Sequence, residues 1–485
     1  MIVSNTENKP ILYTDLFING QFVKSKGEKP FDVINPATEE LIVNIQLCNE
    51  EDVQLAVKAA QDAFESWSSK TPGERALYLL RIADVVENNK EKLAQIEADN
   101  VGKPWSLAIE DVETFIDNIR FFAGAARSLT TINNGQYVEG FTSVLMKEPL
   151  GVVAAIAPWN YPLMMAGWKF GPAIVMGNTM VLKPSEFTPL STLYLMSLIQ
   201  DILPPGVLNV VTGEGRLVAD VLLNSEEVKM ISLTGSVRSG QYLVEHSASK
   251  LKKIHLELGG KAPVVIFDDA DIQQAIDGIL MASFCNTGQE CAAATRIYVD
   301  SKIYDEFSNQ LTESVSAIKV GAPFEEATEM GPLFSAQHLD RVSGFVERAK
   351  VNKDIKILTG GHRIEQKGYY YAPTVITGMQ NDHELIQEEI FGPVITVMPF
   401  DSEEEAYTLA NDSKYALAAS VWTKDVSKSF RATKRIKAGT VWVNTHLIFA
   451  SEFPHSGGNM SGHGKDQSIY ALEEYTQVKH VMFKQ

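Results

Sequence analysis

The chain contains only three cysteines among its 485 residues, Cys48, Cys285 and Cys291. Three thiols at irregular spacing are too few for a disulfide framework, which points to a reducing compartment. No uninterrupted apolar run reaches the length that crosses a membrane. Residues 1–15 lack a basic segment followed by an apolar core, so we expect no signal peptide. Together these absences predict a soluble cytoplasmic protein without a membrane partner.

Basic residues are also fewer than acidic ones. The 43 Lys and Arg are outnumbered by 61 Asp and Glu, and the formal net charge is −18. This balance argues against nucleic acid as a partner and fits a cationic small molecule. The nine histidines lack metal-ligand spacing, and neither HExxH nor a paired CxxC occurs, so we predict no catalytic metal. The length predicts two or three domains.

The amino-terminal part carries signals for a hairpin followed by helices. Asn19-Gly20 lies between two short apolar runs and predicts a type I′ turn. Helical periodicity follows over 53–67, and Thr71-Pro72 marks the start of a second helix. A third helix is predicted over 107–127. These helices are expected to serve packing.

Between Gly151 and Gly260, five apolar runs alternate with helix-length segments. This alternation predicts βαβ units and a parallel sheet, in which ligands bind beyond the carboxyl ends of the strands. Each run is followed by polar or glycine-rich residues: Pro158–Asn160, Lys183–Glu186, Gly213–Gly215, Thr234–Ser236 and Glu257–Gly260. Any one strand needs a turn, but five such endings indicate one continuous binding site.

The glycines in this region suit a dinucleotide only in part. Gly235–Gly240 follows a predicted strand and opens a helix, yet it lacks the middle glycine of GxGxxG and the ending of a P-loop. A plain strand–helix turn is equally consistent. Lys183 and Glu186 favour NAD over NADP, because a carboxylate accepts from a ribose 2′-OH and repels a 2′-phosphate. The alternative for this pair is a surface ion pair.

Cys291 stands in the stretch FCNTGQECAAAT, Phe284–Thr295. It follows a Gly288-Gln289 turn among small residues and is predicted at the head of a helix. A helix N-terminus would lower the pKa of the thiol and favour thiolate, the nucleophilic form. The alternative is that Cys291 serves as a small buried hydrophobe.

The motifs together resemble those of the NAD(P)-dependent aldehyde dehydrogenase superfamily, in order and spacing, from about Leu16 to Val481. They are APWNYP (Ala157–Pro162), KPSE (Lys183–Glu186), LTGS (Leu233–Ser236), LELGGK (Leu256–Lys261), GQEC (Gly288–Cys291) and EEIFGPV (Glu388–Val394). Within the superfamily the chain most resembles γ-aminobutyraldehyde and betaine aldehyde dehydrogenases. SGHGKDQSIYAL (Ser461–Leu472) supports this, since most members carry Glu and Gly where Asp466 and Ser468 stand here.

The resemblance implies a two-stage reaction. Cys291 would attack the aldehyde carbon and form a thiohemiacetal, with the oxyanion held by the Asn160 amide and the Cys291 backbone N–H. After hydride loss, Glu257 would activate the water that hydrolyses the thioester. Members that transfer the acyl group to coenzyme A lack this glutamate, so a free acid is expected.

The resemblance also implies how the ligands are held. NAD would be contacted by Ile156, Ala157, Pro158, Trp159, Lys183, Ser185, Glu186, Gly215, Thr234, Gly235, Ser236, Leu258, Glu389 and Phe391. The aldehyde tunnel would be lined by Tyr161 and Trp168, whose faces suit a cation. Glu290 precedes the nucleophile, and Asp111 and Glu113 lie on the helix bordering the tunnel, with Asp111 favoured to point inward.

These carboxylates predict a small ω-aminoaldehyde as substrate, such as 4-aminobutyraldehyde oxidised to 4-aminobutanoate in putrescine degradation. The alternatives are betaine aldehyde and simple aliphatic aldehydes. An ordinary solvated helix face would equally explain Asp111 and Glu113.

The fold class implied is α/β, an aldehyde dehydrogenase-like fold with three parts. A Rossmann-type parallel-sheet domain would bind NAD and comprise residues 1–134 and 149–258. An α/β catalytic domain would cover 259–451, and a small β oligomerisation element would combine 135–148 with 452–485. The strand edge of that element predicts a homo-oligomer, a tetramer or a dimer.

Two other classes of protein remain open at this point. A cysteine hydrolase or acyltransferase would need a histidine partner, and none occurs in the stretch around Cys291. A catalytically silent binding or structural relative is also conceivable, although Cys291, Glu257 and Asn160 occur together.

Overall fold

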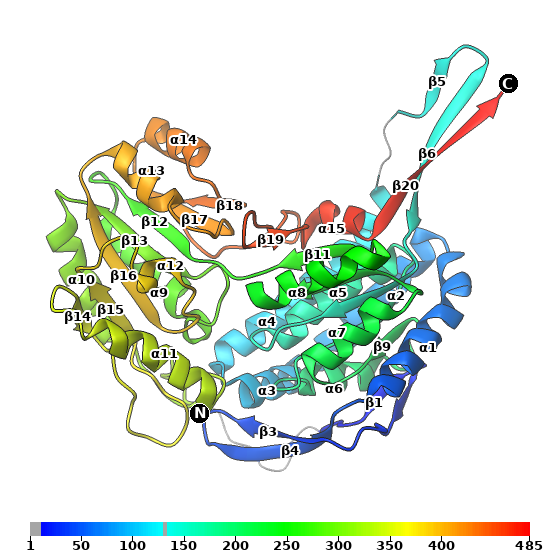
Figure 1. Ribbon diagram of the computed structural model, residues 1–485, viewed down its shortest axis with the longest axis horizontal. Helices are drawn as coiled ribbons and strands as arrows, with labels where there is room; N and C mark the ends of the chain where they lie inside the picture. The colour runs from blue at the N-terminus through cyan, green and yellow to red at the C-terminus, as the bar shows by residue number, and fades with distance from the viewer. Residues whose placement is uncertain (1–10, 130–132) are drawn as a thin grey trace.

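A computed structural model describes residues 11–129 and 133–485, which form two lobes and a projecting arm (Figure 1). Most of the segment in which we expect no signal peptide, residues 1–10, lies outside the described residues. In the described part of the chain, none of the helices combines the length and the apolar character needed to cross a membrane.

The first lobe is built on an eight-stranded sheet. Its order is β19 (Gly462–His463), β11 (Lys253–Glu257), β10 (Val228–Thr234), β7 (Val152–Ile156), β8 (Thr179–Lys183), β9 (Leu208–Val210), β1 (Leu16–Ile18) and β2 (Gln21–Val23). The five predicted strands, β7 to β11, are mutually parallel, which confirms the prediction from their alternation with helices. Asn19 and Gly20 both have positive φ, at 53° and 78°, as the predicted type I′ hairpin requires.

Helices cover this sheet on both faces. They are α1 (Glu50–Ser68), α2 (Pro72–Glu87), α3 (Lys90–Val101), α4 (Trp105–Ser128), α5 (Pro162–Val175), α6 (Leu190–Ile199), α7 (Gly215–Asn224) and α8 (Val237–Ser247). Thr71 caps α2 and Pro72 occupies its first turn, as predicted. Helix α3 was not predicted from the sequence, because its first turn is charged and two polar residues, Glu97 and Asn100, interrupt its buried face. A two-stranded ribbon, β3 (Pro30–Asn35) and β4 (Glu40–Gln46), flanks the lobe.

The second lobe contains a seven-stranded sheet. Its order is β14 (Lys356–Thr359), β15 (Thr374–Thr377), β16 (Val394–Phe400), β13 (Ala294–Asp300), β12 (Ala262–Ile266), β17 (Ala418–Trp422) and β18 (Thr440–Val443). Its helices are α9 (Ile272–Phe284), α10 (Tyr304–Ser316), α11 (Ala336–Ala349), α12 (Glu384–Gln387), α13 (Glu403–Asn411) and α14 (Val426–Arg435). β12 follows β11 after only four residues, so the chain passes directly from one sheet to the other.

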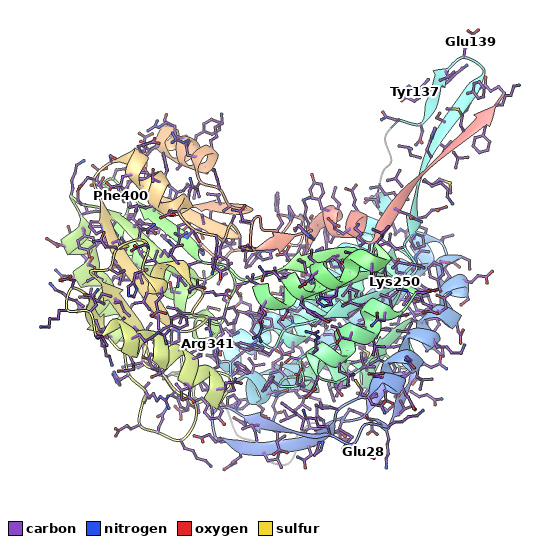
Figure 2. All side chains as sticks on the ribbon, in the orientation of Figure 1. Glu28, Tyr137, Glu139, Lys250, Arg341 and Phe400 are labelled. Carbon is purple, nitrogen blue, oxygen red and sulfur yellow. The ribbon has the colours of Figure 1, made fainter. Side chains whose placement is uncertain are left out.

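The arm is a three-stranded sheet that projects away from both lobes. It pairs β20 (Thr476–Lys484) with β6 (Phe141–Pro149), which also pairs with β5 (Gly135–Val138). Tyr137 and Glu139 mark its tip in Figure 2, and the hairpin and added strand match the predicted pattern. The segment before β20, however, does not belong to the arm. β19 joins the large sheet beside β11, and α15 (Ser468–Glu474) packs on α4 and α5.

Candidate active site

A cavity of about 690 Å³ lies where the two lobes meet. The ends of β7, β8, β10 and β11 form one wall. Loops and helix α11 of the second lobe form the other, including Arg341 of α11, which Figure 2 labels between the lobes. Most of the predicted site residues line this cavity: Ile156, Ala157, Pro158, Trp159, Asn160, Tyr161, Trp168, Lys183, Ser185, Glu186, Thr234, Gly235, Ser236, Glu257, Leu258, Glu290, Cys291, Glu389 and Phe391. Gly215, at the start of α7, is not among the residues that line it.

The nucleophile loop before Cys291 is held in an unusual backbone conformation. Asn286, Thr287 and Gly288 all have positive φ, which costs of order 1–3 kcal/mol for each non-glycine residue. Anchors offset this cost: the Asn286 amide donates to the Asn160 carbonyl at 3.0 Å, and the Thr287 hydroxyl donates to the Gly331 carbonyl at 3.0 Å. The loop therefore presents Cys291 in one orientation between the lobes.

Glycine is required where the strand connection passes this loop. A Cβ on Gly260 would lie 2.1 Å from the Cys291 carbonyl oxygen, so only glycine allows the two backbones to approach. The prediction that Cys291 heads a helix is wrong. A turn follows it and leads into β13, because β13 must begin at Ala294 to join the sheet.

The surroundings of the thiol also differ from the prediction. Burial raises the pKa of the Cys291 thiol well above its usual range, and the neighbouring Glu290, Glu257 and Glu389 add to the rise. The Cys291 Sγ donates to Glu290 Oε1 at 3.1 Å, and the same oxygen accepts from the Ala292 N–H at 3.1 Å. These surroundings favour the thiol form of Cys291, and the expected lowering of its pKa is wrong.

Asn160 lies beside the nucleophile loop, just after β7. Its side-chain Nδ2 donates to the Gln289 carbonyl at 2.9 Å, which uses one of the two amide hydrogens. Its own carbonyl is the acceptor for Asn286. Asn160 is therefore fixed relative to Cys291 and retains an N–H that can donate to a substrate oxygen.

Glu257 ends β11 on the opposite side of the cavity. It is 3 % exposed, and neither of its carboxylate oxygens has a hydrogen-bond partner in the described structure. Burial raises its pKa well above the usual carboxyl range, and the nearby Asp466 adds to the rise. A buried carboxyl without partners is costly and does not stabilise the fold, which makes Glu257 a candidate functional group.

A buried ion pair lies behind Glu257 and was not recognised from the sequence. Lys169 on α5 donates to Asp466 Oδ2 at 2.7 Å, and both side chains are inaccessible to solvent. Asp466 belongs to the motif Ser461–Leu472, from which only a subfamily resemblance was inferred. Nothing in the local sequence connects it with Lys169, because 297 residues separate the two.

His455 lies between Cys291 and Glu257. Its Nε2 is 3.9 Å from Cys291 Sγ and 3.9 Å from Glu257 Oε2. No histidine occurs in the sequence stretch around Cys291, yet the fold brings His455 beside it from 164 residues away. His455 falls in the segment expected to belong to the oligomerisation element, and a reciprocal pair of backbone hydrogen bonds with Asp466 holds it here instead.

The far end of the cavity carries polar groups that suit a dinucleotide. Lys183 Nζ donates to Glu186 Oε2 at 2.8 Å at the end of β8, so the two residues form the predicted pair. The Thr234 hydroxyl is buried without a partner, and Ser236 caps the N-terminus of α8. A carboxylate, an unpaired hydroxyl and a helix N-terminus are the groups that ribose hydroxyls and a pyrophosphate require, so the site fits NAD.

Glu389 and Phe391 reach the cavity from the second lobe. Glu389 Oε1 accepts from the Gly260 N–H at 2.8 Å, and burial raises its pKa to about 7. Phe391 meets the edge of Trp159, which itself stacks on Phe334 with 3.6 Å between ring centroids. Phe334 offers no sequence signal, being a single aromatic residue in a loop.

Aromatic side chains form the wall beyond the nucleophile. Trp168 meets Phe449 edge to face at 6.5 Å between centroids, and Tyr161 closes the same side. The prediction that the Asp111 side chain lines this part of the cavity is wrong. Its carboxylate is buried in an ion pair with Lys103, which also pairs with Glu97 and lies 4.1 Å from the Tyr161 ring centroid.

The prediction that Glu113 lies at the tunnel mouth is also wrong. It lies on the solvent side of α4, 2.6 Å from Lys90 Nζ. The helical argument that only one of Asp111 and Glu113 points inward is confirmed, but the inward one meets a lysine of the protein.

Over 11–129 and 133–485, no group of three or more His, Cys, Asp and Glu side chains is arranged to hold a metal ion.

Known proteins are similar to this chain in sequence and in fold over nearly their whole length. The profile described as "Aldehyde dehydrogenase family" matches residues 22–481. The chain belongs to the aldehyde dehydrogenase family. It is 41 % identical over 475 residues to an aldehyde dehydrogenase of Emericella nidulans, covering 97 % of this chain and 95 % of that protein. It is 39 % identical over 477 residues to the betaine aldehyde dehydrogenase of Bacillus subtilis, covering 96 % of each.

The fold comparison agrees. The NAD⁺ complex of the aldehyde dehydrogenase from Bacillus cereus superposes with a TM-score of 0.95 at 40 % identity, covering 97 % of this chain and 96 % of that one. This enzyme is therefore an aldehyde dehydrogenase with the predicted α/β architecture.

Proposed function

We propose that the enzyme oxidises a small ω-aminoaldehyde, such as 4-aminobutyraldehyde, to the free amino acid with NAD as the electron acceptor. The observation that carries the chemistry is the convergence of Cys291 and Glu257, both 3.9 Å from His455 Nε2, beside the fixed amide of Asn160. A nucleophile, an oxyanion donor and a base thus share one end of the cavity.

The reaction would proceed in two stages. The Cys291 sulfur attacks the aldehyde carbon, and the carbonyl π pair moves to the oxygen, which accepts a hydrogen bond from Asn160 Nδ2. The chemistry that bound NAD supplies is acceptance of a hydride. Loss of that hydride from the carbon re-forms the carbonyl and leaves a thioester on Cys291. Glu257 then takes a proton from water as the water attacks, the C–S bond breaks, and the acid leaves.

The cofactor proposal rests on the pair at the end of β8. Glu186 is held by Lys183 and is only 19 % exposed, so its charge is poorly screened by water. A carboxylate in this position accepts from ribose hydroxyls and repels an added phosphate. NAD is therefore expected to be preferred over NADP. The B. cereus relative with this fold was solved as an NAD⁺ complex, which is consistent.

The substrate proposal now rests on the aromatic wall and Glu290. Tyr161, Trp168 and Phe449 present ring surfaces that attract an ammonium group. Glu290 is the carboxylate beside the nucleophile on this wall, and its neighbour Ala292 fixes one oxygen. The net charge of −18 would draw a cation toward the cavity, an effect that added salt should weaken.

The test compares kcat/KM for 4-aminobutyraldehyde and for uncharged butyraldehyde, in the wild type and in Glu290→Gln. The proposal predicts that the amine is preferred and that the variant narrows the ratio. Changes in thiol reactivity affect both aldehydes alike, so the ratio isolates recognition of the amine. An unchanged ratio in the variant would remove Glu290 from recognition, and no preference in the wild type would contradict an ω-aminoaldehyde substrate.

Betaine aldehyde is the second candidate, because the B. subtilis relative at 39 % identity carries that name. A trimethylammonium group binds through aromatic faces and cannot donate a hydrogen bond to a carboxylate. Activity with betaine aldehyde that exceeds activity with 4-aminobutyraldehyde would favour this candidate.

We also propose that the arm mediates assembly of a homo-oligomer, a dimer or a tetramer. β20 is mostly exposed, with Val478 64 % and Phe483 56 % accessible, and exposed strand edges invite pairing. Sedimentation of the wild type and of a chain shortened before β20 would test this. An unchanged assembly state would contradict it.

A further inference from the structure

The resting geometry leaves the removal of the thiol proton unexplained. Cys291 is a buried thiol whose sulfur donates to Glu290 Oε1. That oxygen is also tied to the Ala292 N–H, an arrangement that keeps the proton on sulfur. A thiol is a weak nucleophile, so a base must take its proton as the C–S bond forms. Such a base must lie near Cys291 Sγ and must be unprotonated near neutral pH.

His455 meets both requirements. Its Nε2 is 3.9 Å from Cys291 Sγ, and its Nδ1 is buried without a hydrogen-bond partner among the described residues. Burial lowers the pKa of His455 to about 4, the nearby Asp466 opposes this effect, and Lys169 reinforces it. The imidazole is therefore neutral at pH 7, and its Nε2, 3.9 Å from the sulfur, is free to accept a proton.

The position of the ring is fixed by its surroundings. The His455 N–H donates to the Asp466 carbonyl, and the Asp466 N–H donates to the His455 carbonyl, both at 2.9 Å. Trp168 and Phe449 pack on the ring at 5.7 and 5.3 Å between centroids. The titratable and charged groups that face it are Cys291 from the nucleophile loop, Glu257 from β11, Asp466 from its own segment, and Lys169 from α5.

We propose that His455 is the proton acceptor for Cys291, serving as general base in acylation and as general acid in deacylation. In acylation Nε2 takes the thiol proton as sulfur bonds to the aldehyde carbon and the carbonyl π pair moves to oxygen. In deacylation Glu257 takes a proton from water, the C–S bond breaks, and the departing sulfur regains the proton from the imidazolium. Glu257 then releases its proton to solvent, so the two bases return to their starting states. The inference rests on the proposed function, because it assigns a role within that reaction.

This division of labour separates His455 from its neighbours. Glu257 acts on water and is needed only after the thioester has formed. Glu290 holds the thiol at rest through an oxygen that also accepts from the Ala292 N–H. Glu290→Gln separates this role from that of a proton acceptor, because loss of the acceptor would slow alkylation whereas loss of a restraint would speed it. His455 alone, of these three, would be needed in both stages.

The test uses alkylation of Cys291 by iodoacetamide, followed between pH 5 and 10 without NAD or aldehyde, with peptide mass spectrometry to identify the labelled cysteine. Variants are His455→Phe, which keeps an aromatic wall, His455→Gln, which keeps a polar side chain that cannot take a proton, and His362→Gln, at an exposed histidine outside the cavity, as the matched control. Cys291→Ala measures labelling at Cys48 and Cys285. Near-ultraviolet circular dichroism and thermal unfolding establish that each variant is folded.

The proposal predicts that both His455 variants slow alkylation at pH 7 at least about tenfold, within the range of general base catalysis. Their rates should then rise tenfold per pH unit, as expected when only pre-formed thiolate reacts. His362→Gln should alkylate at the wild-type rate. Retained rates in both His455 variants, or in either one alone, would overturn the proposal, as would an equally slowed His362→Gln.

Because the assay contains neither cofactor nor aldehyde, its outcome is independent of the proposed substrate. A failure here would leave aldehyde-dependent NADH formation as a separate test. Conversely, an enzyme that ignores 4-aminobutyraldehyde would still show the His455 effect on alkylation.

Discussion

The thiol of Cys291 donates a hydrogen bond to the carboxylate of Glu290, the residue before it, with 3.1 Å between Sγ and Oε1. This contact and the negative charge both raise the pKa of the thiol, after burial itself. Glu290→Gln removes the charge and should lower that pKa. We expect iodoacetamide to label Cys291 several-fold faster near pH 8 in this variant. A rate equal to or below that of the wild type would show that Glu290 does not restrain the thiol.

Cys291→Ala should abolish aldehyde-dependent NADH formation while leaving NAD binding nearly intact. The reason is that Cys291 stands in the nucleophile loop, whereas the proposed dinucleotide groups lie at the ends of β8 and β10. We expect a loss of at least about 10⁴-fold in kcat. Cofactor binding is followed by tryptophan fluorescence. A substantial residual rate would mean that another group is the nucleophile.

The pH dependence of turnover should report the raised pKa of Glu257. A base acts in its deprotonated form, so deacylation speeds up as pH rises through the pKa of the group. Because burial and Asp466 raise this pKa well above the ordinary carboxyl range, kcat should still be rising at pH values where exposed carboxyls are fully ionised. Stopped-flow and steady-state rates measured together identify deacylation as the step concerned. A kcat that is flat from pH 5 upward would contradict the assignment.

Glu186→Ala should narrow the preference for NAD over NADP. The variant removes both the acceptor for the ribose hydroxyls and the charge that repels a phosphate, and we expect the ratio of kcat/KM values to fall about tenfold or more. Glu214→Ala, an exposed carboxylate paired with Lys29 near α7, serves as the control. If both variants keep the wild-type ratio, Glu186 does not contact the ribose.

Asp111→Asn should weaken the fold and leave substrate selectivity unchanged. The substitution leaves Lys103 buried with Glu97 as its remaining carboxylate, and breaking a buried pair typically costs about 3 kcal/mol. Thermal unfolding and the ratio of kcat/KM for charged and uncharged aldehydes are measured on the same preparation. Glu113→Gln, on the solvent side of α4, should change neither. A selectivity change in Asp111→Asn would restore it to substrate recognition.

The parallel sheet and its ligand-binding edge could be predicted because strand alternation is a local signal. Five apolar runs, each followed by a polar or glycine-rich turn, define β7 to β11 and bring their ends together without knowledge of any long-range contact. The hairpin at Asn19-Gly20 is similar, since the turn type depends on two adjacent residues. Asn160 and Lys183 were placed correctly for the same reason.

The errors arise where partners are distant in sequence. His455 reaches Cys291 across 164 residues, and Lys103 neutralises Asp111 from a neighbouring loop, a contact that a helical argument about α4 alone omits. The helix expected after Cys291 failed because the apolar run Ala292–Ala294 suits a helix and a buried strand equally, and the parallel partner β12 decides between them. The prediction that Cys291 is a thiolate failed for the same reason, because it depended on that helix.

The acyl intermediate on Cys291 is the central claim, and Glu257→Gln offers the most direct measurement of it. The variant is mixed with NAD and 4-aminobutyraldehyde, NADH is followed by stopped flow, and the quenched protein is digested for peptide mass spectrometry. The account predicts a burst of NADH close to one equivalent per active site, a collapsed steady-state rate, and the mass of the acyl group on the peptide that contains Cys291. A burst without an adduct, or an adduct on any other residue, would contradict it.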